Sequence, residues 1–378
     1  ASPSAGDIVA VADYAGTAAT NNITIGRNGS NIEGAAGNGV IDNNRDSITL
    51  VYVDATQGWL AVNDNESSFI APTFITATGG TITTCGNFKI HTFTGPGTFC
   101  VSAIGNAQGG PNSVDYMVIA GGGGGGGSRS PGGGAGGGGA GGWRASGGTA
   151  SGCYSAGPSP LVGCVSALPV SVQGYPITVG GAGSGAPSSS PPNATSGSNS
   201  VFSTITSAGG GFGGSPNSPQ LTAEPGGSGG GTPWQARSAP QRGLGNTPPV
   251  SPPQGNNGGL GSGSPHYSGG GGGGAGAAGV DAVPNGAAGN GGSSVCSSID
   301  GSPKSYAGGG GGGSSGPPAG GSGGGAGAGS GGRPGSPGPG TNASDANRGS
   351  GGGGGGQGGL TGGGNGAAGV VVIRYKFQ

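Results

Sequence analysis

Runs of glycine recur throughout the chain after residue 120 and leave few side chains from which to build a core. Glycine supplies 106 of the 378 residues, and the longest runs, some interrupted by alanine or glutamine, are 121–127, 132–142, 269–279, 308–313 and 351–359. Ordering glycine costs more backbone entropy than ordering any other residue. The region is therefore either a disordered linker or a structure in which backbones pack directly against backbones.

The composition favours packed backbones. Glycine and proline together exceed a third of the chain, which is typical of low complexity, yet only 7% of residues are charged and the net charge is −1. A disordered chain is normally kept soluble and expanded by charge, which is lacking here. Collagen is excluded because glycine does not keep a strict every-third spacing and proline falls below the collagen range.

Polyproline II geometry offers a way to order such runs. A chain in this geometry rises about 3.1 Å per residue without internal hydrogen bonds, so residues 121–127 would form a rod of roughly 22 Å. Ordering a residue costs on the order of 1–2 kcal/mol and a net hydrogen bond returns about 1 kcal/mol. Nearly every N–H and C=O must therefore be paired. We expect rods that lie side by side, bonded to one another and anchored at their ends.

The chain divides into three parts by composition. Residues 1–70 contain short segments rich in Ile, Val and Thr between Asn/Gly turns, and they predict a β module whose thin core favours attachment or trimerisation with partner chains. Residues 71–113 predict a β-meander neck, and residues 114–378 predict a glycine-rich rod bundle closed by a C-terminal strand at 370–377. Because no helical periodicity is present, the predicted fold class is all-β plus polyglycine II, without helices.

The neck pattern predicts a particular strand pairing. Strand segments at 80–84, 88–93 and 98–104, separated by short Gly-containing turns, indicate a three-stranded meander. In that meander Cys100 faces His91, which in turn faces Thr81.

Two further strands flank the glycine region. Residues 114–120 run straight into the first glycine run, and residues 369–377 have the same β-branched character. We expect both to lie in one small sheet that brings the two ends of the glycine region together. Shorter strand-like pieces lie between them at 168–179 and 200–207.

Residues that could carry chemistry are few. The chain has two histidines, His91 and His266, and its acids are concentrated in turns of the first 70 residues, where turn formation explains them. Five cysteines without Cys-x-x-Cys spacing, and two neighbouring ligands at most, predict no metal site. The near-zero net charge gives no reason to bind nucleic acid, and without an 18-residue apolar run no membrane insertion is predicted. We expect a non-enzymatic protein without a cofactor.

Aromatic and basic side chains isolated among the glycines are the candidate functional residues. Trp143 and Phe212 lie directly against glycine runs, and we expect them to cap rods and shield them from water. Longer polar loops carry the candidate receptor contacts, because aromatic rings stack on sugars and anchor interfaces, often beside arginine. These residues are Tyr154, Trp234, Arg237, His266 and Tyr267.

Several stretches resemble the glycine-rich domain of bacteriophage tail-fibre and adhesin proteins. They include residues 78–104, the strand 114–120 followed by 121–127, the Pro/Asn-rich stretch 245–259 and the closing segment 370–377. The front segment, with Ala-Asp-Tyr-Ala-Gly-Thr at 12–17 and Arg-Asn-Gly-Ser-Asn-Ile-Glu-Gly at 27–34, resembles a β module that precedes such domains in phage fibres. Together the resemblances cover nearly the whole chain.

The resemblance implies a homotrimeric, extracellular virion protein joined to other tail or virion proteins. It also implies that loops on a polyglycine II scaffold contact a bacterial surface glycan or an outer-membrane protein. Whether the rods are formed within one chain or shared by three stays open. Two alternatives remain: a purely structural fibre without a receptor, and an ice-binding protein, which would need a flat face that the long Pro-rich loops interrupt.

The loop from 153 to 170 departs from the family pattern. Cys153 and Cys164 close ten intervening residues rich in Pro, Gly and Ser, a spacing compatible with a disulfide bond. The alternative is that both thiols are reduced and buried, since phage proteins fold in a reducing cytoplasm.

Overall fold

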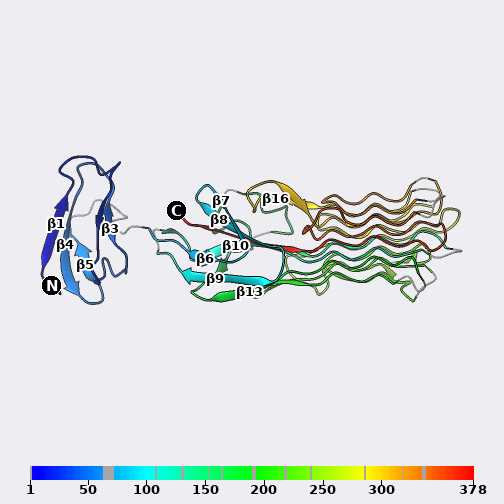
Figure 1. The fold of residues 1–378 in the computed structure, drawn as a ribbon, viewed down its shortest axis with the longest axis horizontal. Coiled ribbons are helices and arrows are strands. Elements are labelled where there is room, and N and C mark those ends of the chain that lie inside the picture. Colours follow the sequence, from blue (N-terminus) through cyan, green and yellow to red (C-terminus); the bar gives the residue numbers. More distant parts are fainter. Residues whose placement is uncertain are drawn as a thin grey trace.

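The computed structural model describes residues 2–62, 72–106, 109–128, 132–152, 154–162, 165–189, 193–216, 219–238, 241–284, 287–317, 319–333 and 338–378. Over these residues the fold is all-β without an α-helix, as the sequence predicts. Figure 1 shows a front β module, a neck of small sheets and a bundle of parallel traces. None of the described residues forms a helix long and apolar enough to cross a membrane.

The front module is built from two small antiparallel sheets. One has the order β1-β4-β5 and the other pairs β2 with β3. The strands are β1 (Ile8–Ala12), β2 (Ile23–Ile25), β3 (Gly39–Ile41), β4 (Ser47–Asp54) and β5 (Gly58–Ala61). Alternation along β4 turns Ile48 and Leu50 inward, where they join Ile32 and Ile41 in a small core.

From here on the name neck denotes two larger sheets and a hairpin, in which strands from residues 76–103 are joined by strands from residues 113–376. The first sheet has the order β11-β10-β18-β8-β7, with β12 also paired to β10, and the second has the order β15-β14-β13-β9-β6. The first sheet comprises β7 (Thr81–Cys85), β8 (Phe88–Phe93), β10 (Ser113–Ile119), β11 (Trp143–Ala145), β12 (Leu168–Pro169) and β18 (Val370–Lys376). The second comprises β6 (Thr76–Thr78), β9 (Gly97–Ala103), β13 (Gly174–Thr178), β14 (Ser200–Phe202) and β15 (Ile205–Ser207), and the hairpin pairs β16 (Val295–Ser297) with β17 (Lys304–Tyr306).

Strand β18 lies at the centre of the neck because both of its faces are apolar. Val371, Ile373 and Tyr375 contribute to a core shared with the second sheet, whereas Val370 and Val372 contribute to a separate cluster on the opposite face. A strand buried on both faces reads as a nearly continuous apolar run, as this one does.

The expected pairing of the two flanking strands is confirmed. β10 and β18 are antiparallel neighbours, with Tyr116 opposite Ile373 and Ile119 opposite Val370. The sheet thus brings the beginning and the end of the glycine region together, 250 positions apart in the chain numbering at Ile119 and Gly369. The short pieces near 168–179 and 200–207 also form strands, β12 to β15.

The predicted meander is wrong in its third strand. β7 and β8 form the expected hairpin, but β8 pairs on its other side with β18 instead of β9. His91 therefore lies opposite Ile82 and Ile373, and Cys100 lies opposite Thr78 and Gly174 in the second sheet. The physical reason is that β9 crosses over to cover the apolar face of β18, and its Phe99 is completely buried there.

The glycine runs form rods that leave the neck and return to it, as the parallel traces in Figure 1 show. In rod 121–127, N–H groups three residues apart donate to the same neighbouring rod. The bonds run from Gly121 to Ser198 and Gly124 to Thr195, from Gly122 to Ala367 and Gly125 to Gly364, and from Gly123 to Gly139 and Gly126 to Gly136. A partner period of three residues is that of a polyproline II helix, so the expected rod geometry is confirmed.

Carbonyl groups of the same rod follow the same period toward three further rods. Gly121 and Gly124 accept from Gly210 and Gly213, Gly122 and Gly125 from Gly183 and Ala186, and Gly123 and Gly126 from Gly352 and Gly355. The rod thus has three neighbours through its N–H groups and three through its C=O groups. All of these neighbours belong to the same chain.

Close packing of backbones explains why the interior of the bundle needs glycine. A Cβ atom at Gly123 would overlap the carbonyl of Gly211, and one at Gly310 would overlap the carbonyl of Gly352. Such overlaps are with backbone, which cannot rotate away as a side chain can. Interior rods therefore accept only a few small side chains, such as those of Ala135 and Ala140, and larger ones are restricted to the outer rods and the connections.

Outer rods satisfy their outward-facing N–H groups with asparagine side chains. The Asn365 amide oxygen accepts from the N–H of Gly185 at 2.7 Å, and the Asn257 amide oxygen accepts from the N–H of Gly245 at 2.8 Å. Equivalent bonds are made by Asn199, Asn290 and Asn342. These side chains replace the rod that an interior position would have as its neighbour.

Candidate functional site

The rods end in two sets of connections, one at the neck and one at the far end. At the neck the carbonyl of Gly142 accepts from the N–H of Ala120. At the other end of the same rod, Gly134 donates to the carbonyl of Tyr267 and accepts from the N–H of Trp234. We call the surface at this far end the distal face, and define it by Trp234, Arg237, His266, Tyr267 and Arg333.

Two aromatic rings form the centre of the distal face. The centroids of Trp234 and Tyr267 are 4.6 Å apart, with the ring planes tilted by 55°. Both side chains are half-buried, and together they cover Gly133, where a Cβ would overlap atoms of both residues. The pair thus closes the end of a rod, and each of the two residues keeps part of its surface exposed to solvent.

Two candidate polar side chains flank the aromatic pair. The guanidinium of Arg237 lies against Gly263, where a Cβ would overlap it, and the residue is exposed. The imidazole of His266 lies against Gly316 and is half-buried. No ion-pair partner for Arg237 occurs among the residues that the structure describes.

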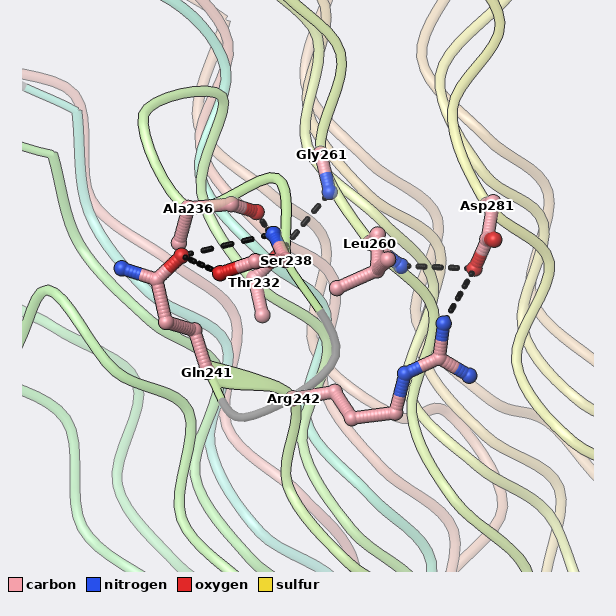
Figure 2. A network of polar contacts seen from close by, with 8 residues as sticks. All are labelled: Thr232, Ala236, Ser238, Gln241, Arg242, Leu260, Gly261 and Asp281. Atoms are coloured by element: carbon pink, nitrogen blue, oxygen red, sulfur yellow. Dashed lines mark hydrogen bonds and ion pairs between the residues drawn. The ribbon is translucent and has the colours of Figure 1, made fainter.

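Hydrogen bonds fix both ends of the loop that carries Arg237 (Figure 2). The hydroxyl of Thr232 donates to the carbonyl of Ala236 at 2.6 Å and accepts from the N–H of Gly261 at 2.7 Å. The hydroxyl of Ser238 donates to the amide oxygen of Gln241 at 2.9 Å. The backbone before Arg237 is therefore held to the neighbouring rod through Gly261. The backbone after it is bonded to Gln241, whose carbonyl accepts from the N–H of Ala223.

The neighbouring arginine has a different environment. Arg242 lies 3.5 Å from a carboxylate oxygen of Asp281, and the same oxygen accepts from the N–H of Leu260 at 2.8 Å (Figure 2). The charge of Arg242 is thus compensated within the bundle, whereas that of Arg237 faces solvent.

Tyr154, the fifth candidate receptor contact, lies in the neck and not at the distal face. Its ring packs beside the neck core, with the guanidinium carbon of Arg374 5.3 Å from the ring centroid. Burial raises the pKa of its phenol, and the nearby Asp115 carboxylate adds to this shift. The structure therefore separates Tyr154 from the four candidates that it brings together.

The two candidate rod caps occupy different positions. Trp143 is fully buried in β11, at the neck end of rod 133–142, with its ring 6.1 Å from that of Tyr306. Phe212 is half-buried along the side of its rod, where its N–H donates to the hydroxyl of Ser196 and its carbonyl accepts from Glu224. Phe212 thus lies within a rod and not at its end.

The cysteines provide no further site in the described structure. Cys85, Cys100 and Cys296 are free, and the predicted pair Cys153 and Cys164 lies outside the described residues. Among the described side chains, no three His, Cys, Asp or Glu residues gather as a metal site would require.

The fold and the distal face define a class of protein in which a bundle of rods extends from a β-sheet neck. The rods are hydrogen-bonded to one another through their backbones and are connected by loops at the end opposite the neck. The family model of the glycine-rich domain matches residues 94–376, which is most of the chain, and the chain belongs to that family. No curated protein and no solved structure matches the chain.

Proposed function

We propose that the chain is a non-enzymatic phage tail-fibre or adhesin protein that attaches to a bacterial surface through the distal face. The observation that carries this proposal is that the rods and the far-end loops of the bundle have separate structural roles. Rod interiors are held by backbone bonds alone, so the loops at the far end are free to carry recognition residues. The resemblance of the strand-then-glycine segments to phage adhesins supports the same function.

The front module supports a role in attachment to the rest of a virion. Its exposed surface includes large apolar side chains on the same face of the neighbouring strands β1 and β4, with Ile8 67% and Val53 41% exposed. Apolar groups of this kind are typical of surfaces that partner chains cover. In this proposal the module joins copies of the chain, as a homotrimer, or joins it to other tail proteins, and the protein is extracellular on the virion.

Binding of the labelled full chain to a panel of intact bacteria tests this function. The double variant Trp234→Ala/Tyr267→Ala removes the exposed aromatic surface of the distal face and should lose most of the binding to a susceptible strain. Leu244→Ala/Val280→Ala is the matched control, because it removes two exposed apolar side chains from rods outside the distal face and should leave binding unchanged. Equal binding by all three proteins would favour a purely structural fibre.

A further inference from the structure

Charge is divided unevenly along the chain. Residues 1–71 contain eight acidic side chains and two arginines, whereas residues 72–378 contain five acidic and ten basic side chains. The first part thus has a net charge of −6 and the second of +5, although the whole chain has −1. The small net charge of the whole chain therefore hides a separation of charge between its two parts. Each part creates an electrostatic field that can attract groups of the opposite charge.

The five acids of the second part lie away from the distal face or are compensated. Asp115 and Asp300 belong to the neck, where they accept hydrogen bonds from serine and tyrosine hydroxyls. Asp345 lies in a connection at the neck end, Asp281 is bonded to an arginine, and Glu224 lies along the side of a rod. No acidic residue occurs among the described residues of the distal loops.

The distal face therefore presents positive charge without a neighbouring carboxylate. Arg237 and Arg333 are both exposed, and no ion pair is formed by either with another described residue. Arg333 follows Gly332, whose N–H donates to Gly354 near the far end of the bundle. Both arginines lie at the same end as the Trp234–Tyr267 pair.

We propose that the distal face binds an anionic polysaccharide of the bacterial surface. Arg237 and Arg333 contact its phosphate or carboxylate groups, since a guanidinium matches these groups with paired N–H donors. The exposed parts of Trp234 and Tyr267 contact the sugar rings. This inference rests on the proposed function and names its ligand class.

An array of purified neutral and anionic bacterial polysaccharides, probed with the full chain at low and high salt, tests the inference. The wild type should bind anionic members, and binding should weaken as salt screens the exposed charges. Arg237→Gln/Arg333→Gln should weaken binding about tenfold or more. The matched control Arg144→Gln/Lys376→Gln removes the same charge from the neck and should bind like wild type. Binding to neutral polysaccharides alone, to none, or equal loss in both double variants would overturn the inference.

Bacterial envelopes, with and without protease treatment, separate this inference from the proposed function. Envelope binding that is abolished by protease and unaffected by Arg237→Gln/Arg333→Gln would indicate a protein receptor, so the function would stand and the inference would fall. Polysaccharide binding on the array without any envelope binding would count against the function alone. Light scattering at low salt measures self-association of the chain. If the wild type self-associates, Arg237→Gln/Arg333→Gln does not, and no polysaccharide binds, the distal face binds the acidic front module of another copy. That result would overturn the inference.

Discussion

The neck and the rod bundle are stabilised by opposite means. In the neck, side chains from two sheets bury one another, and the Phe99 ring lies within 6.3 Å of the centroids of four other rings. In the bundle, carbonyl and N–H groups of adjacent rods bond directly, and a Cβ at interior glycines such as Gly123 or Gly310 would overlap a neighbouring carbonyl. The comparison teaches that burial of apolar side chains and saturation of backbone hydrogen bonds can each order a region of one chain.

The largest expected effect comes from placing a side chain inside the bundle. Gly123→Ala puts a methyl group onto the carbonyl of Gly211 and should lower the free energy of unfolding by more than about 4 kcal/mol. Gly181→Ala is the control, because its Cβ would meet only the Ser198 hydroxyl at 3.7 Å, an ordinary contact. Thermal and denaturant unfolding measure the difference, and equal stability of the two variants would mean that the rods do not pack as described.

A cavity in the neck tests whether the bundle depends on it. Phe99→Ala removes a fully buried ring and should cost about 3–5 kcal/mol. Because β10 and β18 hold both ends of the glycine region, hydrogen exchange should also accelerate in rod 121–127. Ile82→Ala, at a side chain 44% exposed on β7, should change neither property greatly. Rods that stay protected in Phe99→Ala would show that the bundle is stable independently of the neck.

Asparagine bonds on the outer rods should contribute less. Asn365→Ala leaves the N–H of Gly185 without its side-chain acceptor and should cost about 1 kcal/mol. Amide exchange at Gly185 should accelerate, whereas exchange in the interior rods should not change. Asn22→Ala, at an exposed position of the front module, serves as the control. An unchanged rate at Gly185 would mean that water replaces the side chain fully.

The smallest effect is a pH dependence confined to the neck. Burial lowers the pKa of His91, whose Nδ1–H donates to the carbonyl of Gly79 while Nε2 accepts from the Tyr375 hydroxyl. The unfolded chain therefore binds a proton more readily, and stability should fall as pH decreases through about 6.5. Denaturant unfolding at pH 7 and pH 5.5 should differ by less than about 1 kcal/mol. The difference should shrink in His91→Gln, and an equal slope in both proteins would assign it to other groups.

The rods and the closing sheet follow from the sequence, because few conformations can order long glycine runs and because 114–120 and 369–377 have matching apolar character. The wrongly predicted pairing of β9 with β8 shows what a local sequence pattern does not determine. A short turn at residues 95–97 predicts a hairpin, yet β18, far away in the chain, offers β8 a partner buried on both faces. Which distant strands pair depends on how much apolar surface the pairing buries, and a turn sequence does not contain that information.

The candidate site was predictable in part. Trp234, Arg237, His266 and Tyr267 come together because their rods end side by side, but Tyr154 turns inward since the neck offers its ring an apolar neighbour and a guanidinium. Sequence reasoning missed the bonding of outer rods by asparagine, although Asn-Gly pairs at 257–258, 290–291 and 365–366 carried the signal. The uneven charge was hidden because it cancels in the total.

Because outward and returning rods alternate, such a protein can gain or lose rods only in pairs. The chain leaves the neck at β10 and must be back there to begin β18, so outward and returning rods come in equal numbers. An insertion or deletion that preserves the closing strand therefore contains an even number of rods. Each added pair brings one new far-end connection and leaves the existing ones in place. The distal face can therefore be enlarged in steps of one loop without any change to the loops already present.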